Sequence, residues 1–421
     1  MNTASKKLKC VLCDSTKLEK ITNFPDTPIA NQLFDSETLP PAGQEFFPLN
    51  LCLCLDCKHV QIDTLVDPTI LFADYPYVSN SSLAMAKRLD ALAEKYISQF
   101  KLNSSDLVVE IGSNDGYLLS QIRESGCKII GIDPAINATD IAIKSGIPTV
   151  VDFFSSGVAQ KILEDFSSPK LVIANNVLAH SDSLQDIFSG ISILMGPASV
   201  AVIEFSYIVD VFEKLLFDTI YHEHTSYHSI APLKRFLTQF NLEIFDVERF
   251  DAHGGSARVF IKKVGASQPI LPSVELAIGH EALLGIHEGE TWENFNIRVS
   301  ELAQRLNEEI ANIKVRGETL LGYGVPAKFT SLFHILGLRE KDFDFIVDDN
   351  QLKIGKFAPG TMIEISSPED TPVLDNAVIF SWNYSTSIVE KIVRSERVRK
   401  TSFLPLPEFK VIKLSGNLHN R

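Results

Sequence analysis

A chain of 421 residues is longer than one hydrophobic core usually serves, and it predicts two or three domains at about 150 residues per domain. The hydrophobic content of 45% and the charged content of 22% are those of a globular protein. The formal net charge of -14 repels phosphate backbones, so we expect a small-molecule ligand and no nucleic acid partner. No signal peptide pattern or membrane-length apolar run is present, so we expect a cytoplasmic protein without membrane contact.

Five of the six cysteines lie in the first sixty residues, where Cys10 and Cys13 form one C-x-x-C pair and Cys54 and Cys57 form another. In a reducing compartment such pairs indicate metal before disulfides. We predict a structural zinc ion held by these four thiolates, because a complete set leaves no open position for catalysis. Cys52 is a competing ligand, and five buried free thiols are the alternative. The segment before residue 72 is too small to bury much surface, so zinc would hold it together.

The run FADYPYVSNSS after Leu71 predicts an extended loop, and an apolar pattern from 83 to 97 predicts a helix that leads into a second domain. Tyr75 and Tyr77 in the loop either line a ligand pocket or anchor this bridge.

A strand, a glycine turn and a helix follow in order at 107–111, 112–116 and 117–123. The next strand, at 128–132, ends in Asp133, about where nucleotide-binding α/β folds hold ribose hydroxyls. The pattern E-x-G-x-x-x-G differs from the dinucleotide motif G-x-G-x-x-G. It resembles the motif with which class I methyltransferases bind S-adenosylmethionine.

Further apolar strands at 149–151, 171–174 and 199–203 each precede a polar group, and two more at 243–248 and 257–262 would complete a doubly wound α/β sheet. Ligands of open α/β sheets bind at the carboxyl ends of the strands. We therefore expect S-adenosylmethionine to contact Glu110, Gly112, Asn114, Asp115, Gly116, Asp133, Asp152, Asn175 and Asn176.

The segment 217–229, FDTIYHEHTSYHS, gathers three of the chain's ten histidines with two tyrosines and a glutamate. Such a cluster is suited to general base chemistry, because histidine titrates near neutrality. If the segment is helical, Tyr221, His224 and His228 share a face; a strand would instead pair Tyr221 with Glu223. A buried polar network or a zinc site are the alternatives.

After residue 264 a proline-containing linker leads to a long helix with apolar residues from Phe295 to Ile313 at spacings of three and four. Strands at 319–323, 343–347 and 378–380 predict a second, smaller α/β domain. The glycines at 322 and 324 with Asp348 would also suit a nicotinamide cofactor, but Pro326 disturbs that turn. We thus expect domains at 1–72, 73–265 and 266–421.

Five stretches together give a specific resemblance: the double C-x-x-C, EIGSNDGYLL, NNVLAH, FDTIYHEHTSYHS and HGGSARVFI. They resemble the sugar C-methyltransferases, which methylate nucleotide-linked 4-keto-deoxysugars. The likeness covers nearly the whole chain. It implies a class I methyltransferase domain that is Rossmann-like, between an N-terminal zinc-binding domain and a C-terminal α/β domain.

The resemblance implies that His224 removes the proton beside the ketone, with Tyr221 and Glu223 in the same pocket. The C-terminal stretch is similar to the family's GYGAPAKGNTLL, a domain expected to help hold the nucleotide sugar. Here Phe329, Thr330 and Ser331 replace the family's Gly-Asn-Thr. We expect the substrate to contact Tyr75, Tyr77, His180, Glu204, His222, His253 and Lys328.

The resemblance thus implies a C-methyltransferase that forms an enolate and methylates it at C3 of the sugar, and we expect a monomer or homodimer. An O- or N-methyltransferase would need no ketone, and a non-catalytic zinc-bearing scaffold would not bind S-adenosylmethionine.

Overall fold

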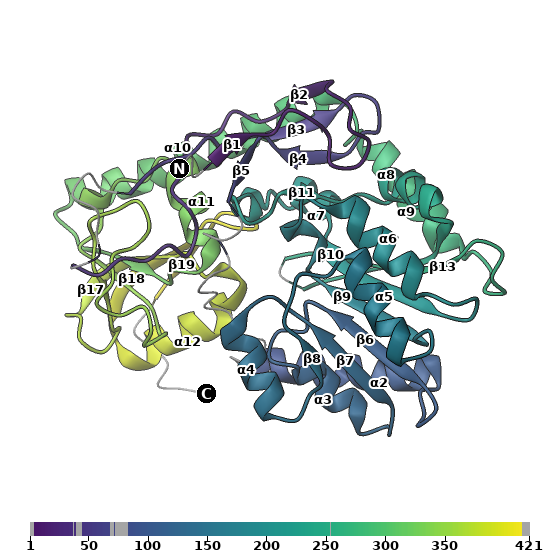
Figure 1. Ribbon diagram of the computed structural model, residues 1–421. Coiled ribbons are helices and arrows are strands. Elements are labelled where there is room, and N and C mark those ends of the chain that lie inside the picture. Colours follow the sequence, from purple (N-terminus) through teal and green to yellow (C-terminus); the bar gives the residue numbers. More distant parts are fainter. Residues whose placement is uncertain are drawn as a thin grey trace.

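The computed structural model describes residues 4–36, 38, 44–67, 71, 83–252 and 254–414, and it contains four β-sheets. Figure 1 shows the N-terminal segment at the top, a large α/β unit at lower right and a smaller one at left, with α10 spanning the top. Tyr75, Tyr77 and His253 lie outside the described residues.

The N-terminal strands are β1 (Ala4–Lys6), β2 (Leu18–Lys20), β3 (Leu51–Cys54), β4 (Val60–Ile62) and β5 (Thr64–Val66). β1 pairs with β5, and β2, β3 and β4 form an antiparallel sheet. The fourth strand of that sheet is β11 (Ser226–Tyr227), which belongs to the histidine-rich segment. The N-terminal sheet is therefore completed by residues from the middle of the chain.

The central sheet has seven strands in the order β12-β13-β10-β9-β6-β7-β8. Pairing from β10 to β8 is parallel, and β13 is antiparallel to both its neighbours. Their bounds are β6 (Leu107–Ile111), β7 (Lys128–Ile132), β8 (Thr149–Val150), β9 (Leu171–Asn175), β10 (Val200–Ser206), β12 (Leu242–Phe250) and β13 (Ser256–Lys263). The predicted doubly wound α/β sheet is confirmed.

Two layers of helices cover this sheet, because its buried strands present apolar side chains alternately to both faces. Val108 and Ile173 face α2 (Leu83–Phe100) and α3 (Tyr117–Arg123), whereas Val109 and Val172 face α5 (Ser156–Asp165) and α6 (Leu184–Leu194). Three further helices are α4 (Ile136–Lys144), α7 (Ile208–Glu213) and α8 (Ile230–Leu237), and η2 (Phe217–Thr219) is a short 3-10 turn.

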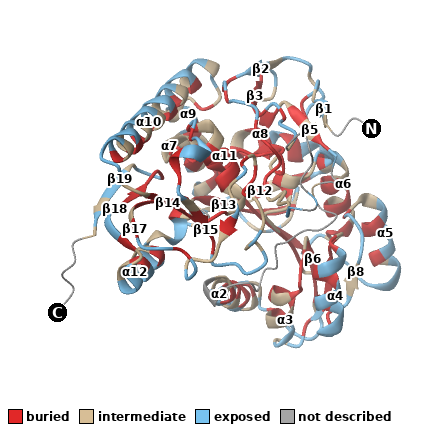
Figure 2. Ribbon diagram, turned by 90° about the vertical axis from the view of Figure 1, so that its left-hand side faces the viewer, coloured by how far each residue is buried: buried red, intermediate tan, exposed pale blue. Residues whose placement is uncertain are grey.

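The predicted long helix is α10 (Gly289–Val315), which follows α9 (Pro272–Leu284). Its apolar stripe from Trp292 to Ile313 is buried, and its opposite face is exposed, as Figure 2 shows. The last sheet has the order β16-β15-β14-β17-β18-β19 and is parallel except for β19. Its elements are β14 (Leu320–Tyr323), α11 (Ala327–Ile335), β15 (Phe345–Val347), β16 (Ile365–Ser366), β17 (Leu374–Ile379), η5 (Trp382–Tyr384), α12 (Ser385–Ser395), β18 (Val398–Leu404) and β19 (Lys410–Lys413).

The N-terminal segment also contacts the C-terminal part of the chain. Phe34 forms an antiparallel bridge with Phe357, and the Gly360 amide donates to Gln44 Oε1 at 2.6 Å. The side chain of Asn296, on α10, donates to the Ile21 carbonyl at 2.9 Å. Among the described residues, no helix has the length and apolar character needed to cross a bilayer.

Candidate active site

The turn after β6 has the backbone conformation that its glycines allow. Gly112 and Gly116 have φ values of +69° and +72°, in the left-handed region that L side chains rarely adopt. A Cβ atom at Gly112 would lie 2.5 Å from Val177 Cγ2, so no other residue fits there without movement. The backbone therefore stays open at the carboxyl end of the strand, where α/β folds bind their ligands.

Asp133 directly follows the neighbouring strand β7 and bonds to this turn. Its Oδ2 accepts the Asn114 amide at 2.8 Å, and its Oδ1 accepts the Ala135 amide at 2.9 Å. Burial raises the pKa of this carboxyl group, and the two amides act in the opposite direction. Each carboxylate oxygen retains acceptor capacity, which suits the hydroxyl groups of a ribose.

Glu110 is a buried carboxyl group near the same turn, and its Oε2 has no hydrogen-bond partner among the described residues. Burial raises its pKa well above the ordinary value, and Asp115 and Asp133 add to the effect. A buried acceptor without a donor is costly, so the site would be stabilised by a cationic or hydrogen-bonding ligand. The amino group of S-adenosylmethionine fits this requirement.

The other expected cofactor residues follow β8 and β9 on the same edge of the sheet. Asp152 is exposed and accepts the Phe153 amide at 2.8 Å. Asn175 ends β9, and its Oδ1 lacks a partner among the described residues. Asn176 has a φ of +56° and donates to Glu204 Oε1 at 3.3 Å. Their contacts with the cofactor remain predictions.

Tyr221 and His224 form the centre of the histidine-rich segment. The Tyr221 hydroxyl lies 2.9 Å from His224 Nε2, and His224 Nδ1 lies 2.8 Å from the carbonyl oxygen of Thr219. A carbonyl oxygen only accepts, so Nδ1 carries the proton. In the neutral ring Nε2 is then the basic nitrogen, and it accepts from the Tyr221 hydroxyl.

His180 borders this pair, and Glu223 lies between its two residues in the sequence. The ring of His180 packs edge-on against His224 with centroids 4.9 Å apart, and His180 Nδ1 donates to the Glu223 carbonyl at 3.0 Å. Burial lowers the pKa of His180 to about 4, so this imidazole is neutral at physiological pH. Burial also raises the pKa of the Glu223 carboxyl to about 7, although its hydrogen bond from Asn31 Nδ2, at 3.2 Å, opposes the change.

Of the two alternatives for this segment, the helix that would place His228 on one face with Tyr221 and His224 is not formed. Residues 221–223 form a turn, and the chain then extends into β11 because it pairs with β4 of the N-terminal sheet. His228 consequently packs between Phe205 and His59, with ring centroids 5.2 and 5.4 Å away. Tyr221 and His224, three residues apart, still contact each other because the turn brings them together.

His222, predicted to contact substrate, points toward the N-terminal segment. It is fully buried, its Nε2 donates to the Pro48 carbonyl at 3.0 Å, and its ring meets Phe47 edge-on. The structure therefore places His222 in the packing between domains and leaves His224 as the histidine bonded to Tyr221.

The four predicted zinc ligands come together. The sulfur atoms of Cys10, Cys13, Cys54 and Cys57 all lie within 4.8 Å of one another, with Cys10 and Cys57 3.4 Å apart. Zn–S bonds of about 2.3 Å place tetrahedral sulfurs about 3.8 Å apart, so this set fits zinc. Among the described residues, Cys52 is not part of the group; it is buried separately, where burial raises the pKa of its thiol to about 11.

Glu204, predicted to contact substrate, is fully buried and bound by two arginines. Arg88 Nη2 donates to its Oε1, and Arg258 Nη2 donates to its Oε2 at 2.9 Å. The strand expected at 199–203 continues as β10 to Ser206, because it pairs with β13. Glu204 therefore holds Arg88 in place; a direct substrate contact remains a prediction.

Arg88 lies at a cavity of about 430 Å³ between the central and C-terminal sheets. Its lining combines basic and aromatic side chains with a glycine-containing loop: Met85, Arg88, Lys214, Asp251, Ala252, Gly254, Trp382, Asn383, Tyr384 and Pro407. Sequence reasoning missed Arg88 and Trp382, because no motif joins positions almost 300 residues apart.

Lys328, another expected substrate residue, lies beside this cavity. Its Nζ is 4.7 Å from the centroid of the Trp382 ring, a cation–π contact, and burial lowers its pKa while nearby Asp218 raises it. Asp218 was visible in the FDTIY motif, but only the fold brings it to Lys328.

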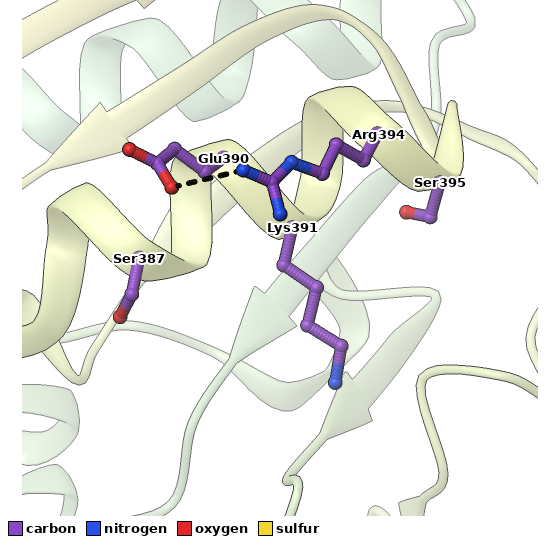
Figure 3. A pocket seen from close by; sticks show the side chains of 5 residues that line it. All are labelled: Ser387, Glu390, Lys391, Arg394 and Ser395. Carbon is purple, nitrogen blue, oxygen red and sulfur yellow. Dashed lines mark ion pairs between the residues drawn. The ribbon is translucent and has the colours of Figure 1, made fainter.

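A second hollow, on the outer side of α12, is shown in Figure 3. Its charged residues are already paired: Glu390 with Arg394 at 3.6 Å, and Lys391 with Asp349. It contains none of the predicted site residues.

Comparisons with known proteins agree with this arrangement. Residues 10–72 match the model of a zinc binding domain, residues 78–247 that of a methyltransferase domain, and residues 251–407 that of a C-methyltransferase C-terminal domain. C-methyltransferase NovU of Streptomyces niveus is 30% identical over 412 residues, which are 97% of this chain and 98% of NovU. The chain belongs to the C-methyltransferase family.

The methyltransferase fold, S-adenosylmethionine as methyl donor and zinc as structural metal, all expected from the sequence, are thereby confirmed for this C-methyltransferase.

Two solved structures resemble it more distantly. Magnesium protoporphyrin IX methyltransferase from Synechocystis PCC 6803 is 14% identical, covers 47% of this chain and 98% of its own, and has a TM-score of 0.35. PH0226 from Pyrococcus horikoshii OT3 is 12% identical, covers 46% and 98%, and has a TM-score of 0.36. Scores this low add nothing to the family assignment.

Proposed function

We propose that this C-methyltransferase acts on a nucleotide-linked 4-keto-deoxysugar and methylates C3, the carbon alpha to the ketone, through an enolate. The observation that carries the proposal is the set of bonds from Thr219 through His224 to Tyr221. A methyl transfer to oxygen or nitrogen needs no carbon acid and little base. An oriented imidazole with a phenol beside it suits proton removal from carbon.

His224 would accept the proton on Nε2, because Nδ1 is committed to the Thr219 carbonyl. The Tyr221 hydroxyl, which donates to Nε2 in the structure, would turn to the developing enolate oxygen and stabilise its charge. S-adenosylmethionine supplies the electrophilic methyl group. His180 would border the sugar, since its ring packs against His224, and Glu223 would do so as the residue next to His224.

The cavity of about 430 Å³ supports a nucleotide-linked substrate over a free sugar. Its volume lies in the range of small-molecule pockets. Arg88 is ion-paired with Glu204, and Lys214 with Asp210 and Asp251, but both side chains line the cavity and would offer N–H donors to a diphosphate. Trp382 and Tyr384 offer aromatic faces for a base. Lys328 lies beside the same wall.

The test is mass spectrometry after incubating the enzyme with S-adenosylmethionine and a panel of nucleotide-linked 4-keto-deoxysugars. We expect a mass gain of one methyl group on one member, and washout of deuterium from its C3-deuterated form in H₂O without the methyl donor. Methylation without washout would favour the O- or N-methyltransferase. Failure to bind S-adenosylmethionine in a calorimetric titration would favour the non-catalytic scaffold.

We further propose a cytoplasmic enzyme, monomeric or homodimeric, without nucleic acid or membrane partners. Its free cysteines and negative charge support this setting.

A further inference from the structure

The carbonyl oxygen of Thr219 holds the imidazole of the candidate base, His224, in place. It accepts two hydrogen bonds, from His224 Nδ1 at 2.8 Å and from the Tyr227 hydroxyl at 3.2 Å. The position of this one oxygen therefore sets both the tilt of the imidazole and the nitrogen that carries the proton.

The residues on both sides of Thr219 are held by side chains of the C-terminal sheet's elements. Before it, the carboxylate of Asp218 accepts the indole N–H of Trp382 at 2.5 Å. After it, the carbonyl of Ile220 accepts the hydroxyl of Ser331, on α11. Two bonds from another domain thus bracket the peptide that orients His224.

Both contacts are buried, so they are not weakened by competing water. Asp218, Ile220 and Ser331 are all fully buried. The Oδ1 atom of Asp218 has no hydrogen-bond partner among the described residues, and its Oδ2 accepts the indole N–H of Trp382. The nearby cation of Lys328 also favours the charged carboxylate.

The indole of Trp382 packs closely against Gly254. A Cβ atom at Gly254, whose φ is +102°, would lie 2.8 Å from Trp382 Cη2 and 2.8 Å from Leu216 Cδ1. The glycine therefore lets the indole approach the segment that leads into η2. Lys328 Nζ lies over the ring, 4.7 Å from its centroid.

We propose that Trp382 and Ser331 are positioning residues, through which the C-terminal domain holds Thr219 and so fixes the orientation and tautomer of His224. This inference rests on the proposed function in taking His224 as the base. It gives a role to the buried hydroxyl of Ser331, which donates to the Ile220 carbonyl of the base segment. The same indole also lines the cavity of about 430 Å³.

The test uses full-length zinc-loaded protein with ¹⁵N-labelled histidine, whose ring shifts report the tautomer directly. The variants are Trp382→Phe, which keeps the ring and removes the N–H; Ser331→Ala; and both together. Trp292→Phe is the matched control, because Trp292 is the only other tryptophan and also donates a buried indole N–H, to the Ile286 carbonyl at 3.0 Å. The His224 signal is assigned by its loss in His224→Ala.

We expect wild-type protein and Trp292→Phe to show His224 with its proton on Nδ1 alone. The Ser331→Ala, Trp382→Phe and double variants should show a mixture of tautomers, with turnover on the identified sugar lowered roughly 10- to 100-fold and the KM for S-adenosylmethionine within twofold. Unchanged His224 shifts in folded Ser331→Ala and in the double variant would overturn the inference. If His224→Ala retains turnover, the base assignment fails, while the shifts still decide whether the C-terminal domain orients this ring.

Discussion

At the scale of single residues, one hydrogen bond decides the chemistry of the histidine-rich segment. Three histidines lie within seven residues, yet His222 and His228 are buried against other domains and only His224 is bonded to Tyr221. Histidines in similar sequence surroundings thus have different roles because their partners differ.

Replacing His224 with alanine should lower turnover by roughly 10²–10⁴-fold, because the reaction loses its general base. Affinities for S-adenosylmethionine and sugar should stay within a few-fold, as measured by calorimetric titration. His222→Ala serves as the control: it loses the bond to the Pro48 carbonyl and should lower stability, while turnover of the folded protein stays near normal. A folded His224→Ala enzyme with the turnover of the wild type would contradict the assignment of His224 as the base.

Glu223 should make stability depend on pH. Burial raises the pKa of Glu223 in the folded state to about 7 from an ordinary 4.5. Between these pH values Glu223 is ionised in the unfolded state and still protonated in the folded state, so the free energy of unfolding falls as pH rises. Glu223→Gln removes this pH-dependent contribution to the free energy of unfolding. Relative to the wild type, the variant should gain on the order of 3 kcal/mol in free energy of unfolding between pH 4.5 and pH 7.

Urea denaturation at pH 5 and pH 8 measures this difference. Glu293→Gln, on the exposed face of α10, controls for the loss of one negative charge. A Glu223→Gln difference that is the same at both pH values would contradict the assigned pKa.

At the scale of elements, β11 connects the zinc site to the base. Ser226 and Tyr227 pair with Gln61 and Val60 of β4, and the Ile62 amide donates to the Thr225 carbonyl at 3.1 Å. β4 in turn pairs with β3, which carries Cys54. The zinc ion therefore orders the sheet that holds the residues directly after His224.

Cys54→Ser should no longer bind one zinc ion per chain. Its turnover should fall on the order of 10²-fold, because a small displacement of a general base greatly lowers the reaction rate. Affinity for S-adenosylmethionine should change little, since its predicted residues lie on the central sheet. Cys52→Ser, the matched control, should retain one zinc per chain and normal turnover. Zinc loss in Cys52→Ser with retention in Cys54→Ser would reassign the ligand.

At the scale of the whole molecule, the three parts of the chain contact one another directly. The N-terminal segment bonds to Glu223 through Asn31 and to Gly360 through Gln44, and α11 bonds to Ile220 through Ser331. The active-site segment therefore lies where all three meet, so its order depends on each of them.

This arrangement predicts cooperative unfolding. The only two tryptophans, Trp292 and Trp382, report on the C-terminal part, and zinc release reports on the N-terminal part. Tryptophan fluorescence and zinc release should have the same urea midpoint within error, because neither part keeps its contacts when the other unfolds. Zinc release well before the fluorescence change would show that the N-terminal domain unfolds independently.

The sequence by itself determined the elements whose signals are local. The periodicity of apolar residues located β6, α3, β7 and the stripe of α10, and the two C-x-x-C pairs located the zinc ligands, because each pattern acts over a few residues. Motif resemblance then gave the family and singled out His224.

Only the tertiary structure decided which groups meet across long separations. Pairing with β4 makes residues 226 and 227 a strand, which moves His228 away from His224; the continuation of β10 beside β13 buries Glu204 between two arginines. Asn31, Ser331 and Trp382 bond to residues of the base segment that are 111 to 192 positions away in the sequence. Such contacts leave no periodic signal, because they depend on how separate domains pack and not on the neighbouring residues of the chain.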